Sequence, residues 1–359
     1  MQNDTITVGL PLNQPTGKFK KKKRSLRQTF LLSFVSSVIG FLLTGIFLLY
    51  GPISYFRVTW VTIAMSTLNH QWMATMLFDQ KTISAILASN KTVEPNQSTN
   101  PLEILSGKGS VKDNATTLPS SPEDGEHIIN GIGFIKLKGS TYNGWMIKVY
   151  DPSRVTLGVS KYLGTRGERV SDMAKRTGSF VAVNAGGFVD VGGQGLGGLA
   201  DGICIADGVR VRYSSNKASP HSIIGIDSKS RLVLGKFTNY QIQEKNLLSA
   251  VEFKPLLIVN GEAAKLYGNG GWGTDPRTAI GQTKSGVMLF LIIDGRRVSS
   301  LGATMKDVQD IMLEYGAYNA ANLDGGSSST LVVKNQVINN PSSSGGERYV
   351  PNAFLIRYR

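Results

Sequence analysis

An uncharged, apolar run over residues 29–51 constrains the fold of this chain more than any other stretch. Phe, Leu, Ile and Val dominate the run, which exceeds the ~18 apolar residues that a helix needs to cross a bilayer. A basic block at residues 18–27 precedes it. Basic residues mark the cytoplasmic side of a span. We therefore predict a basic cytoplasmic tail over residues 1–28, a transmembrane signal anchor over 29–51, and an extracellular location from Arg57 onward.

A cleaved signal peptide is the alternative interpretation of the same pattern. The apolar run is longer than an ordinary signal-peptide core, and no small-x-small cleavage site follows it. Cys204 is the only cysteine, so an intrachain disulfide is impossible. An extracellular domain without disulfides is more typical of a bacterial surface protein than of an animal secreted protein. We predict a single-pass protein of the bacterial cell membrane.

Two segments connect this span to the rest of the chain. Residues 52–90 carry apolar side chains at mixed spacings of three and four, which predicts a juxtamembrane helix. This helix could form a dimer contact or pack on the chain's own domain. Residues 91–127 are rich in Asn, Ser, Thr, Pro and Gly and show little apolar periodicity. That composition predicts a flexible linker.

From residue 128 to 359, short runs of β-branched and aromatic residues alternate with turns of Gly, Asp and Asn. The turn at 206–208 is typical of a hairpin connection. Helical patterns are fewer, and the clearest begins after Thr304, a candidate N-cap, and continues to Tyr315. Many strands with few helices predict an α+β fold. We expect a large mixed, partly antiparallel β-sheet domain, preceded by the single N-terminal transmembrane helix.

Composition and motifs argue against several classes of function. The net charge of +14 suits a polyanionic partner, and charge alone does not choose between nucleic acid and a phosphate-rich polymer. No nucleic-acid-binding module is visible, so we expect no nucleic acid. The chain has 3 His and no Cys/His cluster, which argues against zinc. Residues 193–198 match G-x-G-x-x-G, but a strand-like run follows where a dinucleotide site needs a helix.

The stretch from Asn322 to Leu331 combines a carboxylate, two adjacent glycines and four hydroxyl side chains between a helix-like run and a strand-like run. Adjacent glycines let the backbone turn tightly and approach a ligand. Hydroxyls and free N–H groups can hold phosphate or sugar oxygens. An ordinary Asp-Gly-Gly-Ser turn is the alternative interpretation.

Three other stretches stand in a fixed order with this one. They are residues 184–188 (Asn-Ala-Gly-Gly-Phe), 275–281 (Asp-Pro-Arg-Thr-Ala-Ile-Gly) and 293–296 (Ile-Asp-Gly-Arg). In this order, the motifs resemble those of the phosphodiester glycosidase family, over about residues 128–359. The family's usual first motif is Asn-Ala-Gly-Phe-Phe, and Gly187 replaces its first Phe here.

The resemblance and the side-chain chemistry together predict the site residues. Asp324 is the first candidate for the catalytic carboxylate, and Asp294, at the end of an apolar strand, is the second. Arg277 offers a planar fork that can bind phosphate through two hydrogen bonds. The predicted substrate- and phosphate-binding residues are Arg277, Thr278, Asn184, Gly186, Gly187, Asn322, Gly325, Gly326, Ser327 and Ser328. We predict no metal site and no cofactor; a divalent cation is compatible with the carboxylates but has no ligand motif.

The resemblance implies a membrane-anchored enzyme that hydrolyses a sugar-1-phosphodiester with an N-acetylglucosamine-like sugar. Its substrate would belong to a surface polysaccharide or teichoic-acid-type polymer. The leaving group would be an acidic phosphate monoester, so stabilising its charge should matter more than a strong general acid. The alternative is a non-catalytic glycan- or phosphate-binding protein in exopolysaccharide assembly.

Overall fold

The computed structural model describes residues 26–67, 70–105, 111–190, 195–213 and 220–359. The chain forms two compact units, Met1–Arg57 and Val58–Arg359. The first contains α1 (Leu26–Tyr50), a 25-residue helix with no buried residue. By length and composition, α1 could cross a membrane. It contains almost all of the predicted span, whereas most of the basic block lies outside the described residues.

Three short helices follow where the sequence predicts one helix over residues 52–90. Asp79 begins a new helix inside that range, because its side chain accepts a hydrogen bond from the Thr82 N–H at 2.7 Å. The first of the three packs on the chain's own domain, where Asn269 Nδ2 donates to Thr62 Oγ1 at 2.9 Å. The helices are α2 (Ser54–Ser66), α3 (Trp72–Thr75) and α4 (Gln80–Ser89).

The described residues of segment 91–127 are tied to the domain, in place of the flexible linker that we predicted. β1 (Lys91–Val93) pairs antiparallel with β16 (Lys265–Tyr267). The Thr99 N–H donates to the Leu234 carbonyl at 2.8 Å. The polar residues of this segment therefore form hydrogen bonds with the backbone of the domain. Their composition alone does not reveal these bonds.

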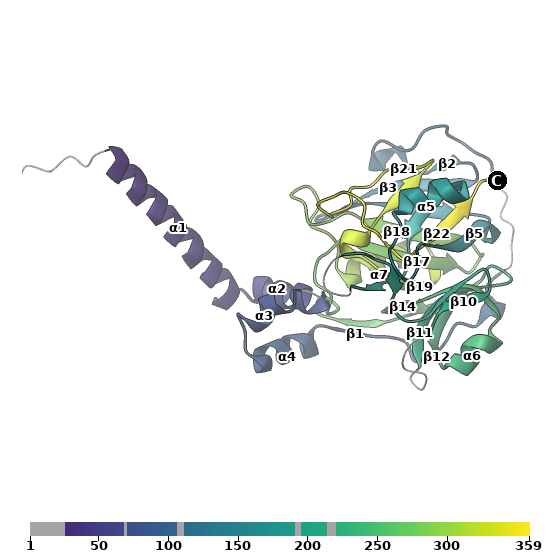
Figure 1. The fold of residues 1–359 in the computed structure, drawn as a ribbon, viewed down its shortest axis with the longest axis horizontal. Coiled ribbons are helices and arrows are strands. Elements are labelled where there is room, and N and C mark those ends of the chain that lie inside the picture. The colour runs from purple at the N-terminus through teal and green to yellow at the C-terminus, as the bar shows by residue number, and fades with distance from the viewer. Residues whose placement is uncertain (1–25, 68–69, 106–110, 191–194, 214–219) are drawn as a thin grey trace, which may run out of the picture. The chain divides into compact units, whose positions relative to one another are not determined.

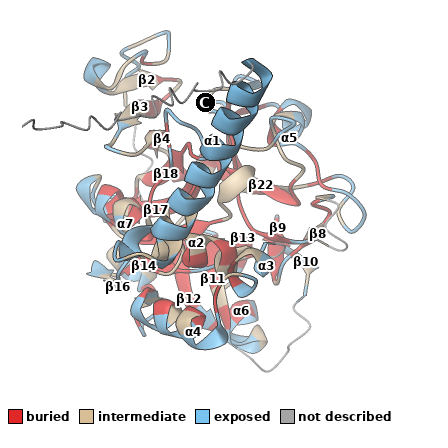
Figure 2. Ribbon diagram, turned by 90° about the vertical axis from the view of Figure 1, so that its left-hand side faces the viewer, coloured by how far each residue is buried: buried red, intermediate tan, exposed pale blue. Residues whose placement is uncertain are grey.

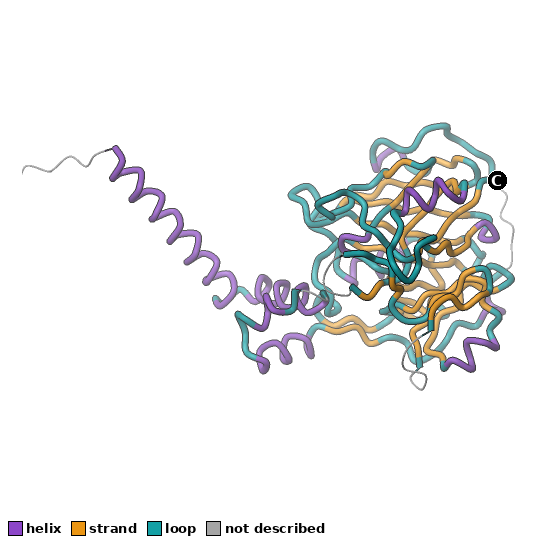
Figure 3. Tube along the Cα trace, in the orientation of Figure 1, coloured by secondary structure: helices purple, strands orange, loops and turns teal. Residues whose placement is uncertain are grey.

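Three antiparallel sheets form most of the second unit, as Figures 1 and 3 show. In spatial order, the first contains β15 (Glu262–Ala263), β14 (Leu256–Val259), β19 (Ala317–Leu323), β17 (Arg277–Thr283), β18 (Met288–Ile293), β4 (Asn143–Val149), β3 (Ile132–Lys138) and β2 (His127–Ile129). The second contains β21 (Gln336–Val337), β20 (Leu331–Val333), β6 (Ser179–Asn184), β22 (Asn352–Arg357) and β5 (Val155–Val159). The third contains β10 (Val209–Arg212), β9 (Cys204–Ala206), β13 (Leu247–Glu252), β11 (His221–Asp227) and β12 (Leu232–Phe237).

The sheets share one hydrophobic core, and each has its other face against one helix. The shared core includes the fully buried Phe134, Phe290 and Phe354. α7 (Met305–Glu314) covers the first sheet, α5 (Val170–Thr177) the second and α6 (Asn239–Glu244) the third. Figure 2 shows buried strands with exposed outer helix faces. The predicted α+β fold with few helices is confirmed, and the pairings between described strands are antiparallel.

Short elements complete the unit. Within the G-x-G-x-x-G stretch, residues 193 and 194 lie outside the described residues. A strand follows this stretch, as the sequence predicts, and it pairs with a strand that precedes it. These two strands are β7 (Phe188–Val189) and β8 (Leu199–Ala200), and single helical turns are η1 (Pro101–Glu103), η2 (Pro122–Asp124) and η3 (Pro152–Arg154).

Candidate active site

Asn184, the last residue of β6, joins the ends of three strands. Its Nδ2 donates to the backbone oxygen of Asp324 at 2.6 Å. Its Oδ1 accepts from the Thr278 hydroxyl at 3.1 Å and from the Thr330 N–H at 3.0 Å. Asn184 and Thr278 are completely buried. The structure thus brings both predicted residues to the loop of Asp324, but as side chains that position it and not as exposed substrate ligands.

The loop after β19 turns sharply at Gly325 and Gly326. Gly326 has a φ of 58°, in the left-handed region that favours glycine. Its N–H donates to the Pro276 carbonyl at 2.9 Å, and a Cβ atom on Gly325 would lie 2.7 Å from that same oxygen. The two glycines therefore let the loop lie directly against Pro276. Gly326 begins the single helical turn η5 (Gly326–Ser328), which contains Ser327 and Ser328.

Asp324 is partly buried at the start of this loop. Burial raises the pKa of its carboxyl to about 6, with the charge of Asp201 acting in the same direction. A hydrogen bond from Ser328 and the charge of Arg348 lower this pKa and so oppose the shift. A carboxyl that ionises near neutral pH is suited to acid–base or nucleophilic work.

Arg348 reaches the same loop, although the sequence analysis does not single it out. Its Nη1 donates to Ser327 Oγ at 2.8 Å. Its Nη2 lies 3.4 Å from Asp190 Oδ2, and its guanidinium lies 4.6 Å from the centroid of the Phe188 ring. No motif marks Arg348 in the sequence, and only the fold brings it to the serines.

Arg348 and Ser327 line a polar cavity of ≈ 620 Å³. Other lining residues include Arg169, Asp190 and Tyr349. His70, which has no ligand partner at helical spacing in the sequence, also lines it. Two arginines and several hydroxyls give this cavity donors for an oxygen-rich anion, beside the carboxylates of Asp190 and Glu347.

Arg277 does not hold the position that the sequence analysis predicts for it. It is 3 % exposed, at the start of a strand in the middle of the first sheet. Its Nε donates to the Ala303 carbonyl at 2.9 Å, and its Nη2 donates to the Trp272 and Gly273 carbonyls at 2.7 Å. Burial lowers its pKa to about 10. The Arg277 guanidinium, which we predict to bind phosphate, therefore binds backbone carbonyls and holds the loop that carries Trp272.

Asp294 also makes its contacts within the protein. It is 6 % exposed and accepts hydrogen bonds from Asn339 Nδ2 at 3.0 Å and from the Asn340 N–H at 2.9 Å. Its backbone oxygen accepts from the Ser300 hydroxyl at 2.7 Å. This carboxylate joins two loops, and its oxygens are engaged by the protein. These contacts suit a residue that positions the two loops, and the catalytic role given to Asp294 as second choice stays a prediction.

Asn322 and Gly186 likewise bind the protein itself. Asn322 is 2 % exposed, and its Nδ2 donates to the Lys254 carbonyl at 3.1 Å. The Gly186 N–H donates to Asn352 Oδ1 at 2.7 Å. Both residues hold strand ends around the Asp324 loop, so neither offers these donors to a substrate.

Gly187 makes room for an aromatic ring from elsewhere in the chain. A Cβ atom at this position would lie 2.9 Å from Phe253 Cε2. The Phe253 ring centroid is 6.5 Å from that of Trp272. The ring of Phe253 thus fills the space beside position 187, where the family motif usually carries Phe. The sequence does not predict that Phe253 lies beside Gly187, because the two residues are far apart in the chain.

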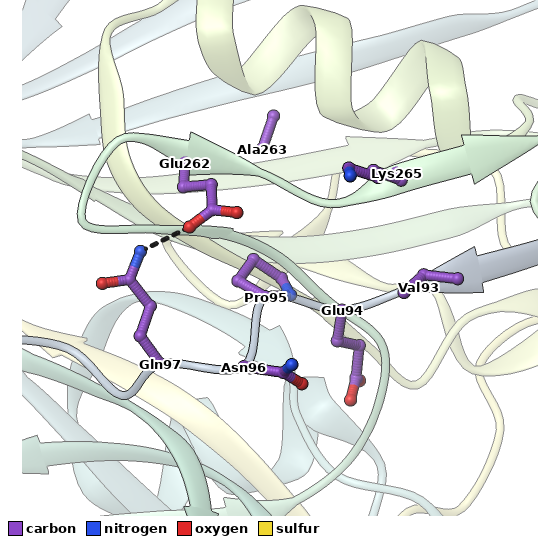
Figure 4. Close-up of a pocket in the computed structure, with 8 residues that line it drawn as sticks. All are labelled: Val93, Glu94, Pro95, Asn96, Gln97, Glu262, Ala263 and Lys265. Atoms are coloured by element: carbon purple, nitrogen blue, oxygen red, sulfur yellow. Dashed lines mark hydrogen bonds between the residues drawn. The ribbon is translucent and has the colours of Figure 1, made fainter.

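A second cavity, of ≈ 460 Å³, lies between the segment after β1 and the strands β15 and β16 (Figure 4). Gln97 Nε2 donates to Glu262 Oε2 beside it at 2.7 Å. None of its lining residues belongs to the Asp324 loop. Within the part of the chain that the structure describes, no group of three or more His, Cys, Asp or Glu residues could hold a metal ion.

The sequence profile of the phosphodiester glycosidase family matches residues 177–357, about half of the chain. This chain belongs to the phosphodiester glycosidase family. The matched range includes the Asp324 loop and Arg348.

Individual relatives agree with this membership. The catalytic domain of zebrafish N-acetylglucosamine-1-phosphodiester alpha-N-acetylglucosaminidase has a similar structure, with a TM-score of 0.52, 25% identity, and coverage of 64% of this chain and 82% of that one. The SPbeta prophage-derived uncharacterized protein YomE of Bacillus subtilis is 31% identical over 58% of this chain and 33% of its own length. The bovine N-acetylglucosamine-1-phosphodiester alpha-N-acetylglucosaminidase is 28% identical over 48% of this chain and 34% of its own. The chain thus spans about a third of the length of these last two relatives.

Proposed function

We propose that this chain hydrolyses a sugar-1-phosphodiester whose sugar is N-acetylglucosamine or a close analogue. The observation that carries the proposal is the partly buried Asp324 carboxyl, with a pKa raised to about 6, on a loop whose Ser327 hydroxyl binds Arg348. A carboxyl of suitable pKa and a cation with the right chemistry for a phosphate thus belong to one loop, which supports the proposal. The names of the zebrafish and bovine relatives support the choice of sugar.

The proposed reaction breaks the bond between the anomeric carbon and the phosphate oxygen. In one route water attacks that carbon and gives its proton to Asp324; in the other the Asp324 carboxylate attacks it, and water cleaves the resulting glycosyl ester in a second step. In both routes the electron pair of the broken bond leaves on the phosphate monoester. Arg348 and the hydroxyl of Ser327 would donate to the departing phosphate, whereas the buried Ser328 hydroxyl donates to Asp324. A phosphate monoester is a good leaving group, so this charge stabilisation contributes more than proton donation.

We further propose that α1 anchors the chain in a bacterial cell membrane, with the second unit outside the cytoplasm. The basic block before the apolar run supports this orientation. The substrate would then be a phosphate-containing surface glycopolymer. Protease added to intact cells should digest the second unit. Protection of this unit until the cells are lysed would contradict the orientation.

The activity can be tested with the full chain in detergent. We would incubate it with methyl phosphodiesters of N-acetylglucosamine, glucose and galactose, each linked at the anomeric carbon, and measure free sugar. We expect release from the N-acetylglucosamine diester and slower release from the other two. Binding of all three diesters without release of sugar would favour the non-catalytic glycan-binding alternative and contradict the proposal.

A further inference from the structure

Basic and aromatic side chains alternate in a row that continues from the cavity beside Ser327. We call Lys161, Tyr162, Arg166, Arg169 and Tyr349 the basic strip. The Arg166 guanidinium lies 4.3 Å from the centroid of the Tyr162 ring and 5.9 Å from that of Tyr349. Arg169 lies 5.3 Å from the Tyr349 centroid, and Lys161 lies 4.8 Å from that of Tyr162. Two rings thus hold three cations in a row.

The three cations of the basic strip, Lys161, Arg166 and Arg169, are exposed and form no ion pair within 4.0 Å among the described residues. Of the two glutamates of the same segments, Glu168 is buried, and Glu347 lines the cavity that Arg169 and Tyr349 also line. Glu168 pairs with Arg176 at 2.8 Å, and Glu347 accepts the N–H of Ser171, in the first turn of α5, at 2.9 Å. The strip therefore presents a concentrated positive charge to solvent.

The backbone beneath the basic strip is held in place by its neighbours. Glu168 and Val350 exchange two backbone hydrogen bonds, at 2.9 and 3.0 Å. The Gly167 N–H donates to the Leu196 carbonyl at 2.7 Å. A Cβ atom on Gly198 would lie 2.4 Å from the Arg166 nitrogen, so this loop packs closely against the strip. A cation row on such a backbone is preorganised for an extended anion.

The basic strip is continuous with the proposed active site. Arg169 and Tyr349 line the same cavity as Ser327 and Arg348. We propose that the basic strip is a second anion subsite, which binds a further phosphate of a polymeric phosphodiester while the scissile bond lies at Asp324. This inference rests on the proposed function, and it makes the substrate a chain of repeated phosphodiesters. A membrane surface is the other extended anion, but the shared cavity favours the polymer.

Kinetics on short and long substrates test the subsite. The strip variant is Lys161→Gln/Arg166→Gln in the full chain, which leaves the cavity-lining Arg169 in place. Its control is Lys81→Gln/Lys112→Gln, which removes the same charge from two other exposed positions of the second unit. The substrates are the methyl diester of N-acetylglucosamine 1-phosphate and an oligomer of N-acetylglucosamine units joined by phosphodiesters.

We expect the strip variant to raise KM for the oligomer about tenfold at low ionic strength, the sum of two exposed charge contacts. High salt should reduce this difference because it screens exposed charges. The kcat on both substrates, KM for the methyl diester, and all values of the control variant should stay unchanged. An equal change on both substrates, or no change on the oligomer, would contradict the second subsite.

A binding measurement separates failure of the subsite from failure of the proposed function. If the wild-type chain hydrolyses neither substrate, the proposed function fails. Linear inorganic polyphosphate should still bind the wild-type chain about tenfold more tightly than the strip variant, and equal binding would contradict the subsite. The oligomer assay is also run in nanodiscs with and without phosphatidylglycerol. An effect of the strip variant that appears only with this anionic lipid would assign the strip to the membrane surface and overturn the proposal.

Discussion

Asp324 and Asp294 both follow a buried strand at the same end of the first sheet, on either side of the start of β17, yet their carboxyls have different surroundings. Asp294 accepts from Asn339 at 3.0 Å and from the Asn340 backbone at 2.9 Å. Asp324 is partly buried, and burial raises its pKa to about 6. A carboxylate whose oxygens are occupied by protein donors holds loops together. A carboxyl whose pKa lies near the working pH can exchange protons with a ligand.

The two arginines near the site repeat this contrast. Arg277 donates to three backbone carbonyls at 2.7 to 2.9 Å and is 3 % exposed. Arg348 is only partly buried and donates to Ser327 at 2.8 Å on the wall of the cavity. Residue type and position at a strand end therefore do not assign a role. The role follows from which hydrogen-bonding partners the fold leaves for the side chain.

The largest expected effect comes from Asp324→Asn. The amide keeps the shape of the side chain but cannot serve as base or nucleophile, so kcat should fall about a hundredfold or more. The melting temperature should change little, and the methyl diester should still bind. Turnover at the wild-type rate would remove Asp324 from the mechanism.

Arg277→Lys should act on stability and not on turnover. A lysine cannot reproduce the planar fork that binds three carbonyls, and at least one buried carbonyl loses its donor. We expect about 1–3 kcal/mol of destabilisation, the cost of a buried hydrogen-bonding group without a partner. Thermal unfolding measures this loss, and kcat per folded molecule should stay within about twofold. A stable variant with strongly reduced kcat would restore the phosphate-clamp role.

Arg348→Gln should weaken substrate binding and leave stability nearly unchanged. Losing a charge on the cavity wall should raise KM for the methyl diester about tenfold, as expected for a charge-assisted contact, and change the melting temperature little. The Arg348 charge lowers the pKa of Asp324, so its removal should move the ionisation of that carboxyl to higher pH. An unchanged KM together with a large fall in the melting temperature would make Arg348 structural.

Asp294→Asn should give the smallest effect. The amide oxygen can still accept from Asn340, but it loses the ionic character of both hydrogen bonds, which predicts about 1 kcal/mol of lost stability. Chemical denaturation should detect this change, and kcat should not move. A loss of kcat comparable to that of the Asp324 variant would place Asp294 in the reaction.

The sequence predicts the fold class well, because its strand and helix patterns are local. Thr304 begins α7 with a hydrogen bond from the Asp307 N–H, as its position before an apolar stripe indicates. The juxtamembrane segment and the linker were less predictable, because their contacts with Asn269, Leu234 and β16 join residues far apart in the chain.

For the site, the motifs locate the loop but not the direction of each side chain. Asn184 and Thr278 meet Asp324 as the motif order predicts, yet they are buried as supports. Arg348 and Phe253 carry no motif, and only tertiary contacts place them beside Ser327 and Gly187. Local patterns find backbone turns reliably. They do not reveal which side-chain donors will bind the carbonyls of neighbouring backbone.

The pH dependence of kcat/KM on the methyl diester tests the role of Asp324 most directly. Since its folded pKa is raised to about 6, the carboxyl favours stability below its ordinary pKa, and that contribution is lost as pH rises through 6. The ionised form is the one that can act as base or nucleophile. We predict that kcat/KM rises with pH up to about 6 and then levels off, with the protein folded throughout. A profile that is flat between pH 4 and 8, or one that falls above pH 6, would contradict this role.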